Sequence, residues 1–453
     1  MRQVRRKTVD PSVRKYLLKA KEEGIRLSWN RFEKMLPQDG FGRLGLTCFD
    51  CLQGPCRLNP FSREEERTIC GRTREELVFK GLCRFLDNSE FKLNQEDLVH
   101  ALENNTGLLG LARGQIEKMK TACASRQVSG ITRQIGLGVL KQDYINLCLE
   151  EVSPVVMKMV QTLTQDLSEE AISRGAKGFN VVIAGDIAPA FPFASVSNTG
   201  GVEFAVLTGL LDLYVVGPNG LGLGKNVVPH YHTIYAEADY GASKIKVKDW
   251  LLQAAVAYTK RDKDKIFPSE EINEVELIGL DKEQIKTNLE NGEIKGICIL
   301  GGGTNLKVTQ DALVCEAVTT IASQDVLCLS YGNTAVTLGK YGYLRDSSPR
   351  DSVLVGKGKF PQVECVGAEI DVVKLIDLVE SIGAQKIVAL FPELTTARDI
   401  IAALTLAGAG VKVLTAINLP LEGSENMTEE IDKLIIYCTP SDYVNQSLAL
   451  LKL

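Results

Sequence analysis

The sequence is poor in histidine and in long apolar runs, and it carries no excess of positive charge. Only 3 of its 453 residues are histidines, which argues against a metal centre built from several imidazoles. No apolar run approaches the ~20 residues that span a bilayer, and no secretory signal follows the basic start of the chain. Acidic residues outnumber basic ones by 57 to 52, giving a net charge of -5 that disfavours nucleic acid or a membrane as partner. We therefore predict a cytoplasmic protein that binds neither.

Cysteine is abundant instead, and its 12 residues are unevenly distributed. A chain of this length folds without disulfide staples, and a dense cysteine group in a reducing compartment more often binds metal. The phrase CFDCLQGPC and one later cysteine give the spacing Cys-x2-Cys-x4-Cys-x13-Cys. Four thiolates at this spacing can hold a [4Fe-4S] cube, with one cysteine for each iron. The predicted metal ligands are Cys48, Cys51, Cys56 and Cys70.

Two other interpretations of these cysteines stay open at this point. Zinc also takes four thiolates, although zinc ribbons favour two separated Cys-x2-Cys pairs and this loop has one. Buried thiols without a metal fit less well, because Arg57 and the acidic residues 64–66 make the loop polar. The spacing therefore favours the iron–sulfur cube.

The order of helical and strand patterns predicts an α + α/β multidomain fold. Helical periodicity covers 12–36, 73–86, 96–123, 138–150 and 153–168. Short continuous apolar runs then alternate with amphipathic helices, which is typical of parallel sheets covered on both faces. The predicted strands are 179–185, 211–217, 232–238, 294–301, 325–330, 362–367, 386–391, 411–416 and 434–438. We expect a helical domain over 1–177 that holds the cysteine loop 48–70, and two doubly wound Rossmann-like domains over 178–274 and 275–453.

Small and polar residues follow several of the predicted strands. Ligands of such sheets lie beyond the carboxyl ends of the strands, so these residues form a candidate cofactor-binding crevice. Tight turns explain the same residues equally well, and no catalytic residue is assigned. The crevice candidates are Asp186, Asn219, Gly303, Thr304, Asn333 and Cys365. His230 and His232 have no third ligand nearby, which favours packing or a hydrogen-bonded strand end over a metal site.

Residues 20–61, ending GRLGLTCFDCLQGPCRLNPF, and the later ICGRT (69–73) resemble one known family. They are similar to the catalytic subunit of nickel-dependent, anaerobic carbon monoxide dehydrogenase, in the hybrid-cluster protein superfamily. That family carries GLLGLCCRNCLQGPCRIDPF and a later CGA. Weaker similarity continues through VVIAGDIAP, AVLTGLLDLYVVG, HYHTIY, ILGGGTNLKVTQDALV, LSYGNTA and VECVG. The resemblance implies that Cys48, Cys51, Cys56 and Cys70 hold the family's inner [4Fe-4S] relay cluster in a shortened, divergent member.

The departures from the family concern its other two clusters. The two cysteines that bridge the family's dimer correspond to Asp39 and Thr47, so we expect no bridging cluster. The catalytic nickel–iron–sulfur cluster needs one histidine and five cysteines. The histidine phrase corresponds to 184–186, the first cysteine is missing around 190–201, and only the last cysteine survives, as Cys365. The other three fall at Asn219, at about Gly303 and at about Asn333. No intact nickel–iron–sulfur cluster is therefore expected.

Three functions follow from the resemblance and its departures. The first is an iron–sulfur electron-transfer protein that does not oxidise carbon monoxide. The second is an oxidoreductase with a rebuilt site in the crevice, for carbon monoxide dehydrogenase-like or hydroxylamine-reductase-like chemistry. The third is a non-redox scaffold subunit. The resemblance also implies an anaerobic host, a homodimer, and a ferredoxin-like protein or larger redox complex as partner; whether the chain is an enzyme stays undecided.

Overall fold

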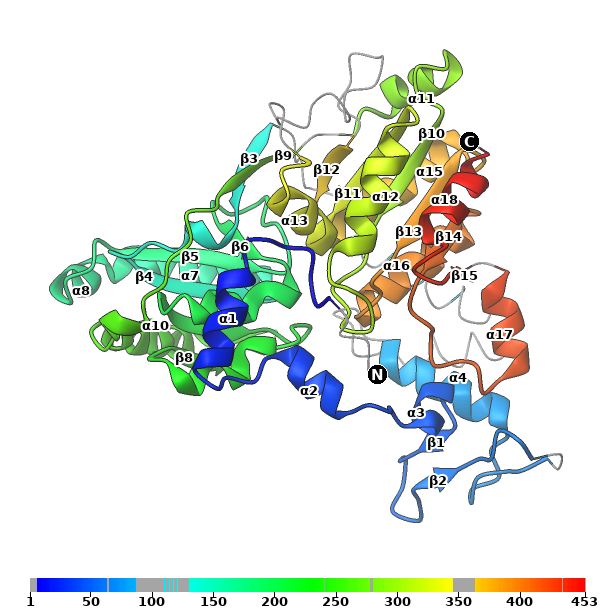
Figure 1. Ribbon diagram of the computed structural model, residues 1–453, viewed down its shortest axis with the longest axis horizontal. Helices are drawn as coiled ribbons and strands as arrows, with labels where there is room; N and C mark the ends of the chain where they lie inside the picture. Colours follow the sequence, from blue (N-terminus) through cyan, green and yellow to red (C-terminus); the bar gives the residue numbers. More distant parts are fainter. Residues whose placement is uncertain are drawn as a thin grey trace.

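One large sheet runs through the molecule (Figure 1). The computed structural model describes residues 6–62, 65–86, 110, 114, 117, 120, 130–239, 241–277, 280–344, 363–433 and 435–452. The sheet has 13 strands in the order β15-β14-β13-β10-β11-β12-β9-β3-β6-β5-β4-β7-β8. The strands are β3 (Ile131–Ile135), β4 (Ile145–Glu150), β5 (Phe179–Ala184), β6 (Ala194–Ser197), β7 (Leu211–Val216), β8 (Ile234–Glu237), β9 (Asn273–Leu277), β10 (Gly296–Leu300), β11 (Val326–Tyr331), β12 (Val363–Gly367), β13 (Ile387–Phe391), β14 (Lys412–Thr415) and β15 (Ile435–Tyr437).

Neighbouring strands of this sheet are parallel except where its two halves meet. There β3 pairs antiparallel with β9, in a register that places Ile131 opposite Leu277. In the first half β4 lies between β5 and β7, and in the second half β10 lies between β11 and β13. Strands β4, β7, β10, β11 and β13 are buried along their whole length, which is why their sequences are mostly apolar.

Helices cover both faces of the sheet. Along β4, Ile145 and Leu147 pack with α7 (Pro154–Asp166) and α10 (Lys244–Tyr258), whereas Cys148 belongs to the apolar cluster of the opposite face. The other helices of this half are α1 (Arg14–Glu22), α8 (Ser168–Ser173) and α9 (Val202–Leu207); those of the second half are α11 (Lys282–Glu290), α12 (Ala312–Ala322), α13 (Gly332–Lys340), α15 (Val372–Ile382), α16 (Ala397–Gly408), α17 (Glu425–Asp432) and α18 (Tyr443–Leu451). The predicted α/β multidomain fold is confirmed.

The cysteine region lies at one edge of the molecule, near α17 in Figure 1. It comprises α2 (Ser28–Lys34), α3 (Gly40–Leu44), the hairpin of β1 (Thr47–Cys48) and β2 (Cys56–Arg57), and α4 (Arg74–Leu86). Helix α4 packs against α16 and α17, so this region rests on the second half of the sheet.

Two of the helical segments predicted in the first 177 residues, 138–150 and 96–123, are not confirmed by the structure. The helix predicted over 138–150 is wrong, because INLCLE forms the buried strand β4. The pattern predicted over 96–123 lies mostly outside the described residues.

The predicted domain boundaries do not coincide with breaks in the sheet. Strand β4 pairs with β5 on the far side of the predicted 177/178 boundary, and the 274/275 boundary falls inside β9. The three-domain division stays a prediction. Within the described residues, no helix is long and apolar enough to cross a membrane.

Candidate functional site

The four predicted ligands lie on a hairpin and on the loop that follows it. Cys48 and Cys56 are opposite each other in the β1–β2 ladder, and Cys51 lies in the turn between them. Cys48 is buried, Cys56 is half-buried, and Cys51 is exposed. The turn is tight at Gly54, where a Cβ would stand 2.9 Å from the Cys56 nitrogen. Glycine at this position lets the chain bring Cys56 back beside Cys48.

Cys70 lies in a second turn that is held by the backbone of its own segment. The Thr68 nitrogen donates to the Arg72 carbonyl at 2.9 Å, and the Gly71 nitrogen donates to the Thr68 carbonyl at 2.8 Å. Thr68 Oγ1 lies 3.3 Å from Cys70 Sγ. This hydrogen bond, with the charge of Arg72, lowers the pKa of the exposed Cys70 thiol. The turn therefore favours a thiolate, the form that binds metal.

A group of charged side chains joins the two turns. Asp50, between Cys48 and Cys51, forms ion pairs with Arg72 at 2.6 Å, Lys80 at 2.6 Å and Arg84 at 2.5 Å. The hydrogen bond from Lys80, followed by Arg72 and the charge of Arg84, lowers the pKa of Asp50 to about 2. Arg72 also donates from Nη1 to Cys48 Sγ at 3.9 Å.

The thiols of these turns do not converge on one point. Within the described residues, no three histidine, cysteine, aspartate or glutamate side chains are placed to hold a single metal ion. In a [4Fe-4S] cube each thiolate binds its own iron, so the sulfurs stand around the cluster instead of meeting at one ion. The exposed thiols, the hydrogen bond to Cys70 and the cation beside Cys48 fit such a cluster.

Three of the six predicted crevice residues, Asp186, Thr304 and Asn333, meet between the two halves of the sheet. The Thr199 nitrogen and hydroxyl donate to Asn333 Oδ1 at 2.8 and 3.0 Å. Asn333 Nδ2 in turn donates to Thr304 Oγ1 at 3.4 Å. These bonds tie the β6–α9 connection of the first half to the loop after β10 and to the start of α13 in the second. The side chains thus bind one another across the crevice.

Glu369 connects Asp186 to this group. Its nitrogen donates to Asp186 Oδ1 at 3.1 Å, and its Oε1 accepts from the Asn333 nitrogen at 2.8 Å. Burial, together with the negative charge of Glu151, raises the pKa of Asp186 well above its ordinary value. Burial likewise raises the pKa of Glu369. Both carboxyls are therefore protonated more readily than exposed ones.

Asp186 and Asn219 also line a cavity of about 80 Å³. Its other polar lining residues include Glu151 and Arg398, which form an ion pair between the end of β4 and α16. Glu151, Asp186 and Asn219 follow β4, β5 and β7, and the chain order reverses between β4 and β7. A cavity beyond this reversal is where open α/β sheets bind ligands.

The remaining crevice candidates lie apart from the cavity. Cys365 is fully buried in β12, and burial raises the pKa of its thiol to about 12. Gly303 is close to Thr395 and Asp399, since a Cβ there would stand 3.1 Å from the Thr395 Cβ. Neither residue is in the lining of the cavity.

Residues 129–434 match the Prismane/CO dehydrogenase family. The chain belongs to this family. Its scaffold is therefore that of iron–sulfur oxidoreductases.

Several relatives of this family match the chain. Carbon monoxide dehydrogenase 2 of Carboxydothermus hydrogenoformans is 22% identical over 485 residues, covering 75% of this chain and 76% of that protein. Carbon monoxide dehydrogenase 1 of Methanosarcina mazei is 46% identical over 80 residues, which are 18% of this chain and 13% of that protein. The carbon monoxide dehydrogenase IV structure from C. hydrogenoformans superposes with a TM-score of 0.78 at 20% identity, covering 99% of each chain. The alpha subunit of an acetyl-CoA synthase/carbon monoxide dehydrogenase gives a TM-score of 0.82 at 17% identity, covering 98% of this chain and 93% of that one. At these identities the structural likeness shows the fold.

The charged residues of the cysteine turns and those at the end of β4 were not predicted from the sequence. Asp50 and Arg72 stand where the quoted family phrases have Asn and Ala, so a paired change of charge was the available signal. Glu150 ends the run 138–150 that was predicted as a helix, and Glu151 follows it. A strand over that run would have put them at the carboxyl edge of the sheet.

The carboxylate of Glu150, at the end of β4, lies against the glycine-rich loop 220–224 that follows β7. This carboxylate accepts hydrogen bonds from the nitrogens of Leu221 at 2.9 Å and Gly222 at 3.3 Å, and from the Tyr214 hydroxyl. Burial raises the pKa of Glu150 to about 7. The loop after β7 therefore binds a carboxylate of this chain.

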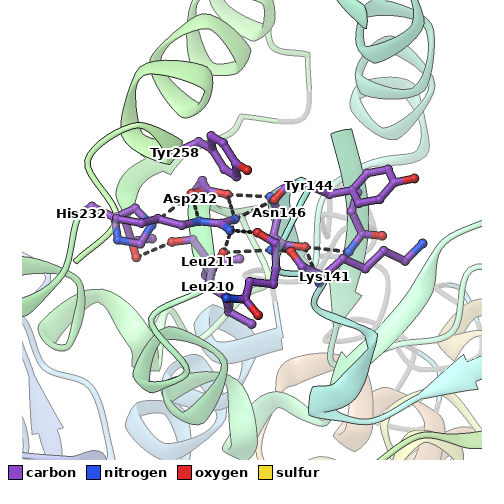
Figure 2. Close-up of polar contacts among 12 residues, drawn as sticks. Lys141, Tyr144, Asn146, Leu210, Leu211, Asp212, His232 and Tyr258 are labelled. Carbon is purple, nitrogen blue, oxygen red and sulfur yellow. Dashed lines mark hydrogen bonds and ion pairs between the residues drawn. The ribbon is translucent and has the colours of Figure 1, made fainter. Parts of the chain in front are cut away.

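A second buried ion pair lies at the opposite, amino edge of the sheet (Figure 2). Arg261 donates to Asp212 at 2.9 and 2.6 Å, and His232 Nε2 lies 3.0 Å from Asp212 Oδ1. Arg261 also donates to the carbonyl groups of Gln142, Tyr144 and Leu210. Of the two predicted alternatives, packing or a hydrogen bond at a strand end, His232 forms the hydrogen bond, two residues before β8.

Proposed function

We propose that this chain is an iron–sulfur electron-transfer protein with one [4Fe-4S] cluster and no working nickel–iron–sulfur site. The observation that carries the proposal is a contrast between two places. The cysteine turns carry four thiols, and charged side chains lie beside them. In the crevice, by contrast, amide and hydroxyl side chains form hydrogen bonds with one another. Cys48, Cys51, Cys56 and Cys70 would hold the cluster, which takes up and releases single electrons when bound.

The crevice residues are poor ligands for a multinuclear iron–sulfur cluster. Soft thiolates select such clusters, and amide and hydroxyl groups do not replace them. Asn333 already forms hydrogen bonds with both Thr304 and Thr199. The one surviving thiol, Cys365, is fully buried and has a raised pKa. Oxidation of carbon monoxide is therefore not proposed.

The two residues that correspond to the family's bridging cysteines have other structural roles in this chain. Asp39 caps helix α3, because its Oδ2 accepts from the Gly42 nitrogen at 2.7 Å. Thr47 lies in β1 with a hydroxyl in place of a thiol. These two observations support the absence of a bridging cluster, so the proposed homodimer would be held by packing alone. A ferredoxin-like protein or a larger redox complex would exchange electrons at the exposed thiols Cys51 and Cys70.

Reductive titration of anaerobically purified protein tests the proposal. We expect dithionite to reduce the cluster of the wild-type protein, which should then give a paramagnetic [4Fe-4S] signal. The protein should not oxidise carbon monoxide. Replacing Cys70 by Ser should abolish the signal, whereas Cys438→Ser, at a distant cysteine, should keep it. Zinc in place of iron, or a cluster that dithionite cannot reduce, would contradict electron transfer and favour the scaffold function.

A second candidate function rests on the cavity at the β4–β7 reversal. An 80 Å³ cavity with the polar groups of Glu151, Asp186, Asn219 and Arg398 can accept a small polar molecule. An oxidoreductase with a rebuilt site there would receive electrons from the cluster. Turnover of hydroxylamine by the reduced protein that is lost in Asp186→Ala, with iron content unchanged, would establish this function in place of plain electron transfer.

A further inference from the structure

We infer that Asp50 and Arg72 form a charge pair that sets the reduction potential of the [4Fe-4S] cluster and fastens the Cys70 turn to the Cys48 hairpin. The inference rests on the proposed cluster. It assigns Asp50 and Arg72 as positioning and tuning residues, since neither is a ligand.

Asp50 lies in the cysteine hairpin and attracts cations from two other segments. This carboxylate lies between two predicted ligands and meets three cations, one from the Cys70 turn and two from α4. The Asp50 side chain is 14% exposed, compared with 30% for Arg72, 40% for Lys80 and 47% for Arg84. Arg72 is the least exposed of the three cations, so solvent screens its charge least.

Arg72 reaches from the Cys70 turn to the hairpin. This residue follows Cys70 by two positions, and its guanidinium contacts both Asp50 at 2.6 Å and Cys48 Sγ at 3.9 Å. One side chain thus joins both segments that carry ligands. Hydrogen bonds to ligand sulfurs and nearby charge are among the main determinants of an iron–sulfur potential. A cation beside Cys48 favours the reduced cluster, because reduction adds a negative charge.

The sequence at positions 50 and 72 departs from the family phrases. The family phrases CRNC and CGA place Asn and Ala where this chain has Asp50 and Arg72. The substitutions at 50 and 72 change the charge by one unit each in opposite directions, whereas Phe49, where the phrase has Arg, removes one further positive charge. The ion pair that the structure forms between them explains why they occur together.

Four proteins test the inference: wild type, Arg72→Ala, Asp50→Asn, and the double variant that carries both family residues. The measurement is the midpoint potential of the cluster, from anaerobic potentiometric titration followed by electron paramagnetic resonance. Arg72→Ala should lower the potential and Asp50→Asn should raise it. Each should change the reduction equilibrium by about threefold to tenfold, where tenfold equals about 59 mV for one electron. The double variant should return to the wild-type potential.

Arg174→Ala provides the control, because Arg174 pairs with Glu170 on α8, far from the cysteine turns in Figure 1. It should leave the potential unchanged. Equal potentials in all four proteins, or shifts of one sign in both single variants, would overturn the inference. If Arg72→Ala holds no iron, Arg72→Lys, which keeps a cation beside Asp50, should hold it, and failure to do so would also overturn the inference. A wild-type protein without a cluster would instead contradict the proposed function.

Discussion

Single thiolates determine whether the cysteine turns hold a cluster. Cys51 lies in the exposed turn of the hairpin, where its thiol supports no apolar core. Cys51→Ser should therefore lower bound iron from about four per chain to well below one while the fold persists. Iron analysis and far-ultraviolet circular dichroism check this together. Cys315→Ser, on α12, is the matched control and should keep its iron; full iron in Cys51→Ser would remove Cys51 from the ligands.

The buried carboxyl of Glu150 predicts how stability depends on pH. Burial raises the pKa of this group from 4.5 to about 7, so the folded chain keeps a proton that the unfolded chain releases. The free energy of unfolding contributed by Glu150 is therefore fully present below pH 4.5 and is lost as the pH rises through 7. Glu150→Gln should flatten this decline and raise stability at pH 8 by about 1 to 3 kcal/mol. Urea unfolding at pH 5 and pH 8 measures it; an unchanged pH dependence would show that Glu150 is ionised in the folded protein.

Strands β4 and β7 are fastened to the end of α10 by the pair Asp212–Arg261. The side chains are 0% and 6% exposed, so removing one partner leaves a buried charge without its counter-charge. Arg261→Met should lower the free energy of unfolding by about 3 to 5 kcal/mol. Lys225→Met breaks an exposed pair with Glu237 and should cost less than about 1 kcal/mol. Urea unfolding followed by circular dichroism compares the two, and equal effects would refute the role of the buried pair.

The sequence predicted those elements whose pattern is local. Strands such as β10, β11 and β13 are apolar runs between helices, and the cysteine spacing alone indicated a cluster site. INLCLE was misassigned because a buried strand of six residues and a buried helical segment share the same apolar pattern. Asp212–Arg261 and Glu151–Arg398 join residues far apart in the chain, and only the folded sheet brings them together.

The exposed apolar side chains of the cysteine region bear on the assembly of the whole molecule. Four of them flank the predicted ligands: Phe49 is 70% exposed, Leu52 105%, Phe61 89% and Ile69 64%. Such residues are common at protein–protein interfaces. If a second copy covers them, Leu52→Glu with Phe61→Glu should convert a dimer into a monomer. Light scattering after size-exclusion chromatography checks this, with Ile245→Glu, at an exposed position on α10, as control. A wild-type monomer would contradict the proposed homodimer.

The metal content of the intact chain tests the central claim most directly. The protein should be produced and purified without air, in medium that contains both iron and nickel, and its metals counted by mass spectrometry. The account predicts about four irons per chain and no stoichiometric nickel. Nickel near one per chain, or iron well above four, would mean that the crevice holds a nickel–iron–sulfur cluster despite its oxygen and nitrogen side chains.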